Sequence, residues 1–271
     1  MKQALDINLT PTQFDELNAV LRELTERAAG ILGDNFVGAY LQGSFAVGDA
    51  DAMSDCDFLI PTHGPVTAAQ EQGLRALHRE FPARAEHWAQ HLEGSYPPAG
   101  ELRTLDALDR DWLYVDHGHT EMEWSTHCNT EVVRWSLREC GVILAGPDPK
   151  SLVDEVPPGV LRSKMRALIP RLLPDMQAWI SLDVSWAQRY AVATTCRMLH
   201  TLDNGRVSSK KAAMIWGRDR LDPRWSPLIQ NALDSRFAQW DAPSNPDLLA
   251  ETLAFVEYGE GLARASDNRD R

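Results

Sequence analysis

Residues 43–57, GSFAVGDADAMSDCD, carry the strongest structural signal in this chain. The run before them, FVGAYLQGS at residues 36–44, is rich in β-branched and aromatic residues and predicts a strand that stops at the Gly-Ser pair. The run after them, CDFLIPT at residues 56–62, predicts a second strand. Because side chains alternate along a strand, we expect Asp55 and Asp57 to point to the same side.

This arrangement suits a nucleotide together with its metal ions. A glycine and a serine at a strand end let backbone N–H groups and a hydroxyl approach phosphate oxygens closely. Two carboxylates on one side can hold hard cations about 3.5–4 Å apart, as two-metal phosphoryl chemistry requires. We therefore predict that Gly43 and Ser44 contact phosphate and that Asp55 and Asp57 bind Mg²⁺, with two ions in the site.

The residues around this stretch predict a first part that mixes strands and helices. Thr10, Pro11 and Gln13 favour the start of a helix that Gly33 ends. The other predicted elements are strands at residues 88–96 and 112–115, helices at 66–80 and 131–140, and a short strand followed by a turn in VILAGPDP, residues 142–149.

After Pro157 and Pro158, every periodic run predicts a helix. We expect a bundle whose core is rich in tryptophan, and domains at residues 1–157 and 158–271. The predicted helices cover residues 159–182, with breaks at Pro170 and Pro174, and residues 186–203, 208–221, 226–240 and 246–264. The fold class is therefore α+β, with a mixed sheet and its helices followed by an all-α bundle.

Two levels of resemblance support this interpretation. The Gly-Ser pair, the spacer and Asp-x-Asp resemble the signature of polymerase-β-like nucleotidyltransferases. The runs TEMEWSTHCNTEVVRWSLRECGVILAGPDP, residues 120–149, and RYAVATTCRMLHTLDNGRVSSKKAAMIW, residues 189–216, resemble the aminoglycoside adenylyltransferases that modify streptomycin and spectinomycin. The resemblance implies a Mg²⁺-dependent transfer of AMP from ATP to a hydroxyl of a small molecule, with release of pyrophosphate.

The resemblance also implies roles for individual residues in catalysis and nucleotide binding. The family has a third carboxylate that acts as general base or shares a metal ion, and it matches Glu93 in LEGSYPP, with Glu86 as the alternative. Arg197 and Lys210 match positions that contact the triphosphate. Cations there would neutralise the departing pyrophosphate.

The acceptor side of the site is implied in the same way. Trp124 and Tyr190 match family positions that contact the drug, and we expect His127, just after Trp124 in the same run, to line the acceptor pocket. Ala187 stands where the family has an acidic residue that holds streptomycin. The resemblance therefore supports the reaction more strongly than it supports one drug as substrate.

Composition limits the partners. The 271 residues carry a formal net charge of −12, which repels a nucleic acid backbone and favours a small cationic acceptor, or a nucleotide with its metal. No apolar run is long enough to span a membrane, and the first residues lack the pattern of a signal peptide. The four cysteines are scattered, which favours free thiols in a reducing cytoplasm. We expect a monomer or a small homo-oligomer.

Two other functions compete with nucleotidyl transfer. An antibiotic kinase would need an HGD-type catalytic loop, but residues 116–119 read DHGH. A nucleotide-binding or regulatory protein of the same fold could have lost catalysis, but the intact Asp55, Asp57 and Gly-Ser pair argue against that loss. The histidines of HGH and the THC that follows match no zinc-binding spacing, so we expect them to serve in loops and packing.

Overall fold

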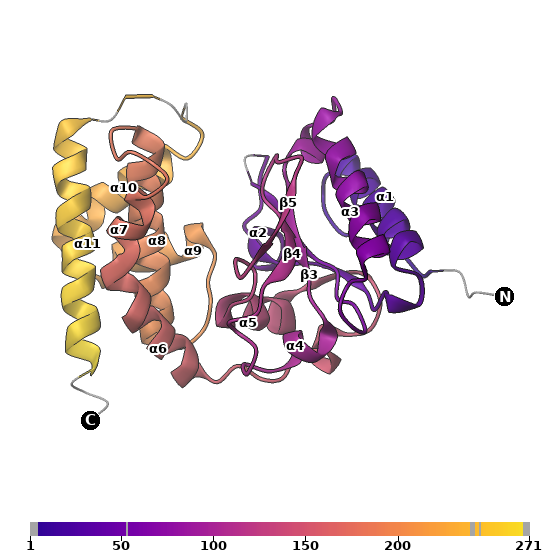
Figure 1. Cartoon of the computed structure of the whole chain (residues 1–271). Helices are drawn as coiled ribbons and strands as arrows, with labels where there is room; N and C mark the ends of the chain where they lie inside the picture. Colours follow the sequence, from indigo (N-terminus) through magenta and orange to yellow (C-terminus); the bar gives the residue numbers. More distant parts are fainter. Residues whose placement is uncertain (1–4, 53, 239–241, 244, 268–271) are drawn as a thin grey trace. The chain divides into compact units, whose positions relative to one another are not determined.

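The computed structural model describes residues 5–52, 54–238, 242–243 and 245–267. The chain divides into two compact units, Met1–Val156 and Pro157–Arg271, which differ in architecture (Figure 1). The first unit combines strands and helices, and the second is helical. The predicted α+β class is confirmed.

A mixed sheet with the strand order β5-β4-β3-β2-β1-β6 forms the centre of the first unit. β2 and β3 are parallel, and every other neighbouring pair is antiparallel. The strands are β1 (Ala39–Leu41), β2 (Cys56–Leu59), β3 (Leu92–Tyr96), β4 (Trp112–Val115), β5 (Met122–Ser125) and β6 (Val142–Ala145).

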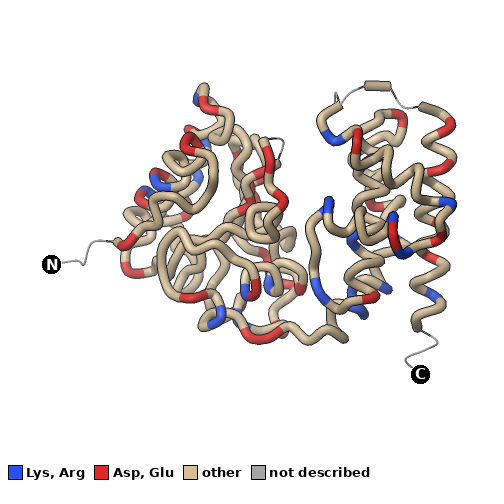
Figure 2. Tube along the Cα trace, turned by 180° about the vertical axis from the view of Figure 1, so that it is seen from behind, with Lys and Arg blue, Asp and Glu red and all other residues tan. Residues whose placement is uncertain are grey.

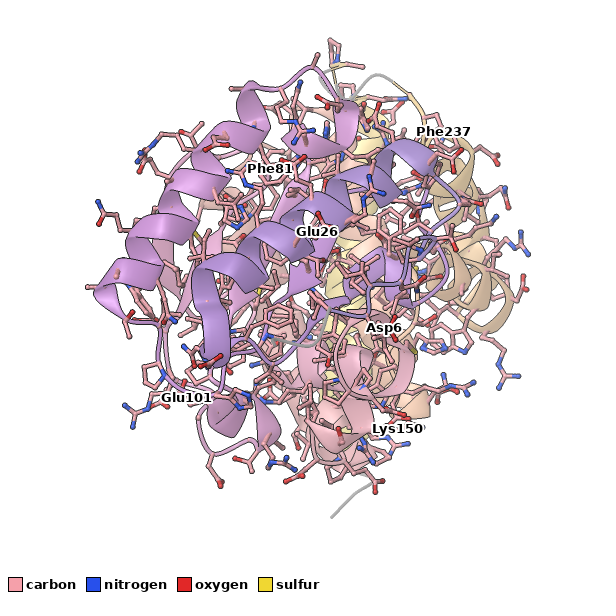
Figure 3. All side chains as sticks on the ribbon, turned by 90° about the vertical axis from the view of Figure 1, so that its right-hand side faces the viewer. Asp6, Glu26, Phe81, Glu101, Lys150 and Phe237 are labelled. Carbon is pink, nitrogen blue, oxygen red and sulfur yellow. The ribbon has the colours of Figure 1, made fainter. Side chains whose placement is uncertain are left out.

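Helices cover both faces of this sheet. α1 (Asp15–Leu32) and α3 (Ala68–Glu80) pack on one face, and Figure 3 looks onto these two helices, with Phe81 labelled beside them. The helices α4 (Ala99–Arg103) and α5 (Glu131–Cys140) contribute Leu102 and Leu137 to the core on the other face. The remaining short helices are α2 (Gly43–Ala46), η1 (Gly33–Asn35), η2 (Phe81–Ala83), η3 (His87–Gln90) and η4 (Pro149–Ser151).

Successive side chains of β2 point to opposite faces of the sheet and pack in different cores. Cys56 and Phe58 are fully buried in the core beneath α1 and α3, whereas Leu59 belongs to the core on the opposite face. Asp57 lies between Cys56 and Phe58 and therefore points to the opposite face. The same alternation places Glu93 of β3 on that face, because Leu92 packs in the first core.

Several boundaries differ from those predicted. α1 begins at Asp15 rather than near Thr10, because the Asn18 amide binds both the N–H and the carbonyl of Thr12 at 3.0 Å and holds that segment outside the helix. The strand predicted at residues 36–44 keeps only its centre, and its end forms α2. Most of the first half of the segment at residues 88–96 is the 3-10 helix η3. The edge strand β5 was not predicted.

The second unit is helical, as predicted. The break at Pro170 is confirmed, whereas Pro174 lies in the first turn of a helix, where its missing N–H costs no hydrogen bond. Among the described helices, none is both long and apolar enough to cross a membrane. The elements are α6 (Pro158–Leu168), η5 (Ile169–Arg171), α7 (Leu172–Gln177), α8 (Ser185–Asn204), α9 (Lys210–Arg220), η6 (Pro223–Trp225), α10 (Ser226–Asp234) and α11 (Pro246–Asp267).

The predicted tryptophan-rich core of this unit is wrong. Trp225 is buried, but Trp179 is 59% exposed, and Trp186 and Trp216 are half-buried. Trp240 lies outside the described residues. Aliphatic residues fill most of the core instead, together with Phe255 and Trp225.

A buried histidine in the first unit is expected to make the free energy of unfolding depend on pH. His78 of α3 is buried, its Nε2 lies 2.7 Å from the Tyr96 hydroxyl, and its ring stacks on Phe58. Burial lowers the pKa of His78 to about 3. Its folded form is therefore neutral, whereas the unfolded chain takes up a proton below about pH 6.5. We expect this group to remove up to about 1.4 kcal/mol of stability per pH unit as the pH falls below that value.

The measurement is urea unfolding of the wild type and His78→Gln at several values between about pH 7 and pH 4.5. Glutamine does not titrate, so the variant is expected to lose stability with falling pH less steeply, whatever its stability at pH 7. The exposed His63, replaced by Gln, is the control and should keep the wild-type slope. Equal slopes for all three proteins would contradict the assignment to His78.

Candidate active site

Three predicted carboxylates lie together on one face of the sheet. Asp57 of β2 stands directly opposite Glu93 of β3 in the parallel register. Asp55 comes just before β2, and Asp55 and Asp57 flank the buried Cys56, whose N–H donates to the carbonyl of His91 at 2.8 Å. Since Cys56 points into the core, both aspartates point away from it. The Asp-x-Asp pair and Glu93 thus share one region.

At Gly43, just after β1, the backbone packs closely against the side chain of Asp57. The N–H of Gln42 donates to the carbonyl of Asp57 at 3.0 Å, and Gly43 follows with a positive φ of 58°. A Cβ at Gly43 would lie 1.9 Å from the Oδ2 of Asp57, so the carboxylate occupies the space that any side chain would need. Glycine is required here for two reasons, the backbone conformation and the close approach.

Ser44 places a hydroxyl beside this contact. The Gly-Ser pair forms the start of α2 rather than the end of the predicted strand. Within the described residues the Oγ of Ser44 is buried and has no hydrogen-bond partner. A buried polar atom of this kind calls for a partner that the protein itself does not supply, and a phosphate oxygen fits the chemistry of a hydroxyl donor.

Two side chains hold the carboxylate of Glu93. The Tyr114 hydroxyl lies 3.0 Å from Oε1, and Nε2 of His127 lies 3.1 Å from the same oxygen. The rings of Tyr114 and His127 stack with their centroids 4.9 Å apart. Among the described residues, no hydrogen bond involves Oε2 of Glu93. One oxygen is therefore fixed in place, and the other is available for a ligand.

One more acidic residue, Asp116, and one basic residue, His117, complete the cluster. Neither was predicted from the sequence. Asp116 lies 3.0 Å from the Tyr114 hydroxyl, and Nδ1 of His117 lies 3.2 Å from Asp55. Both come from the DHGH segment after β4, which the sequence pattern assigned to a loop. The only signal that could have found them was their position at the end of a strand next to β3.

The electrostatics of the cluster reflect its excess of carboxylates. Burial, and then the charges of Glu93 and Asp116, raise the pKa of Tyr114 above its ordinary value, so its hydroxyl keeps its proton. The hydrogen bond to Glu93 raises the pKa of His127 and favours its protonated form. Burial raises the pKa of Cys128 to about 12, with smaller effects from the same carboxylates. Burial is thus the main cause for Tyr114 and Cys128, and the neighbouring carboxylates add to it.

Glu86, the alternative to Glu93, lies elsewhere. It precedes η3 and forms an ion pair with Arg84 at 2.7 Å, and Arg84 also binds Glu23 of α1 at 2.7 Å.

Trp124 is also separate from the cluster. It pairs with Leu113, a residue of the core beneath α1 and α3, and its indole N–H donates to Glu71 of α3 at 3.3 Å. Its assignment to the acceptor site gains no support from this position.

The second unit brings its predicted residues together on α8 and α9. The Nζ of Lys210, at the start of α9, lies 5.8 Å from the centre of the Tyr190 ring. Arg197 donates to the carbonyl of Ser208 at 3.3 Å. Tyr190 and Arg197 are seven residues apart on α8 and so lie on one face of it. Ala187 is fully buried in the core of this unit.

Comparison with known proteins decides the family. An aminoglycoside (3'') (9) adenylyltransferase of Shigella flexneri is 31% identical over 276 residues, covering 90% of this chain and 96% of that protein. A Klebsiella pneumoniae protein of the same description is 31% identical over 287 residues, covering 96% and 97%. This chain belongs to the aminoglycoside adenylyltransferase family. It is a nucleotidyltransferase, and the predicted resemblance is confirmed.

Two further comparisons agree with this family. The model "Aminoglycoside adenylyltransferase, C-terminal domain" matches residues 151–258. The crystal structure of a spectinomycin adenyltransferase from Enterococcus faecialis with ATP and spectinomycin superposes with a TM-score of 0.69 at 15% identity, covering 93% of this chain and 100% of that one. At this identity the likeness shows the fold. The adenylyltransferase fold therefore extends over both units.

The cluster of this adenylyltransferase suits Mg²⁺ rather than a closed protein metal site. In the described part of the chain, no three carboxylate, imidazole or thiol groups are placed so that they could hold a metal ion on their own. Mg²⁺ does not need such a set, because one or two carboxylates usually hold it together with waters and substrate phosphates. Asp57 and Glu93 on adjacent strands, with Asp55 nearby, provide hard oxygen donors of this kind.

Proposed function

We propose that this adenylyltransferase transfers AMP from ATP to a hydroxyl of a spectinomycin-type antibiotic and releases pyrophosphate. The observation that carries the proposal is the register of β2 and β3, which sets Asp57 opposite Glu93, while Gly43 packs closely against the Asp57 carboxylate. Relatives named spectinomycin 9-adenylyltransferase, such as that of Campylobacter jejuni (22% identical over 94% of this chain), support the choice of acceptor.

In this proposal the first unit is the catalytic domain. Asp55 and Asp57 would hold Mg²⁺, two ions in all, and Glu93 would either share a metal ion or act as the general base. When bound, Mg²⁺ neutralises charge on the triphosphate and orients it for in-line attack at the α-phosphorus. Gly43 lets the backbone approach the phosphates, and the Ser44 hydroxyl donates to one of their oxygens.

Glu93 is proposed as the general base. The contacts of Tyr114 and His127 with Oε1 hold the carboxylate in one orientation, and Oε2 accepts the proton of the acceptor hydroxyl. The glutamate side chain is only 14% exposed, which keeps bulk water from competing for that position, whereas His127 is 60% exposed and can contact the acceptor as well. The oxygen of the deprotonated hydroxyl then forms the new bond to phosphorus as the bond to pyrophosphate breaks.

For the second unit we propose that Lys210 and Arg197 contact the triphosphate and that Tyr190 contacts the antibiotic. Trp186 stacks on Tyr190 with ring centroids 5.1 Å apart, and the exposed Trp179 lies edge-on to both. Such aromatic surfaces bind cationic sugars and cyclitols through apolar and cation–π contacts. The buried Ala187 offers no carboxylate, which favours spectinomycin over streptomycin as the acceptor.

One assay tests the reaction and the acceptor together. The protein is incubated with ATP, Mg²⁺ and one antibiotic at a time, and pyrophosphate and ADP are measured. We expect pyrophosphate with spectinomycin, much less with streptomycin, and none when the acceptor is omitted. Formation of ADP would show a kinase, and ATP binding without turnover would show a protein that has lost catalysis; either result would contradict the proposal.

A further inference from the structure

The second unit contains a cavity that the proposed reaction does not use. It has a volume of about 450 Å³ and lies between α6, the end of α8, the end of α9 and the end of α11. A cavity of this volume accommodates a small organic molecule. Its walls combine three arginines, Arg162, Arg166 and Arg220, with the indole of Trp216 and several leucines.

The cavity is positively charged in a protein that is strongly negative. Among the described residues that line the cavity, the three guanidinium groups face one carboxylate, Asp203, whereas the whole chain carries −12. Figure 2 shows several Lys and Arg positions in the lower half of the helical unit. Fixed positive charge in a recess of low dielectric raises the local concentration of anions and repels the cationic drugs of this family.

Two of the arginines are held in place by the helices. Arg162 donates to the carbonyls of Leu202 and Asp203 at the end of α8, both at 3.2 Å. Arg166, one turn further along α6, donates through Nε to the Ser266 hydroxyl of α11 at 3.2 Å. Because these bonds restrict the side chains in advance, an anion that binds here orders fewer groups. Arg220 is the last residue of α9 and adds a third guanidinium.

The rest of the lining is apolar. Leu199 and Leu262 line the cavity together with Trp216, whose ring lies edge-on to His200 with the centroids 5.4 Å apart. Trp216 is half-buried, so part of the indole remains accessible. A ligand that satisfies both parts of this cavity carries an anionic group for the arginines and a flat or apolar body for the indole and leucines.

The cavity lies on another side of α8 from the residues proposed for nucleotide and drug. Tyr190 and Arg197 share one face, and at about 100° per residue Leu199 and Leu202 lie roughly 140–200° around the helix from Arg197. A ligand in the cavity would therefore not displace groups at the Tyr190 face. The cavity is a separate site within the same unit.

We propose that this cavity is a second binding site, which takes a small organic anion with a phosphate or carboxylate on an aromatic or alicyclic body.

The probe is phenyl phosphate. Inorganic phosphate, which has the charge without the ring, and phenol, which has the ring without the charge, are the comparison ligands. Binding is followed by the indole N–H signals of the tryptophans in nitrogen-15 NMR spectra, and Trp216→Phe identifies the signal of Trp216. We expect a saturable shift of that signal, with affinity at least about tenfold higher for phenyl phosphate than for either part.

The arginines provide the matched variants. Arg220→Gln and Arg166→Gln are each expected to weaken phenyl phosphate binding about tenfold. Arg171→Gln is the control, because Arg171 belongs to the same unit, is 70% exposed and pairs with Asp175 away from the cavity. ATP-dependent shifts of other signals should survive in Arg220→Gln, so failure of the cavity and failure of the nucleotide site are distinguishable. An unmoved Trp216 signal, equal affinity for inorganic phosphate, or equal weakening by Arg171→Gln would overturn the proposal.

Discussion

Asp57→Asn is expected to lower kcat by about 10³-fold or more while leaving the fold intact, because a neutral amide cannot hold Mg²⁺ on the triphosphate. Asparagine has the size of aspartate, so the contact with Gly43 and the backbone bond to Gln42 can both be kept. The variant's free energy of unfolding should therefore stay close to that of the wild type.

The measurements are pyrophosphate release at saturating ATP and acceptor, and urea unfolding of the same preparations. Asp109→Asn is the control, because Asp109 is an exposed aspartate of the same unit and should retain wild-type kcat. Near-normal turnover of Asp57→Asn would refute the role of Asp57 in metal binding. Loss of turnover together with a lowered unfolding midpoint would assign the effect to folding instead.

Gly43→Ala is expected to damage both stability and activity, by a cause that differs from that of Asp57→Asn. The left-handed backbone conformation alone costs an alanine about 1–2 kcal/mol. The methyl group would also occupy the position of the Asp57 carboxylate, 1.9 Å from Oδ2, so that the side chain must move. A displacement of about 1 Å in a reacting group can lower the rate by about 10²-fold, and we expect a loss of this size in kcat.

Gly48→Ala separates these two effects. Gly48 also has a positive φ, of 77°, but a Cβ there meets nothing within 4 Å. The two variants should lose similar stability through backbone strain, and only Gly43→Ala should lose most of its activity. Comparable activity in both variants, measured by pyrophosphate release, would show that the contact with Asp57 is not needed to place the carboxylate.

The local part of the site follows from the sequence. Asp55, Cys56 and Asp57 alternate in a strand, and that alternation puts the two carboxylates on one side whatever the strand packs against. The helices of the second part follow in the same way from apolar residues at helical spacing, and their starts at Ser226 and Pro246 agree with the prediction. Local geometry requires no knowledge of distant segments.

The partners of Glu93 depend on contacts that are distant in sequence. Tyr114 and His127 reach its Oε1 only because β4 pairs with β3 and the chain returns through β5, pairings that no short pattern encodes. β5 itself was missed because MEWS is a short edge segment whose alternation is weak. The exposure of tryptophans such as Trp179 also depends on how the helices pack, since the helical period shows which residues share a face but not what covers it.

The sequence by itself thus determined the family, the two kinds of architecture and the Asp-x-Asp pair, because each rests on spacing along a single strand or helix. Only the tertiary structure decided that Asp57 lies opposite Glu93, that Glu86 and Trp124 lie elsewhere, and that Gly43 packs against the Asp57 carboxylate. The physical reason is the register between strands. Hydrogen bonds and packing between distant segments set that register, and it alone brings the carboxylates of two strands to the same point.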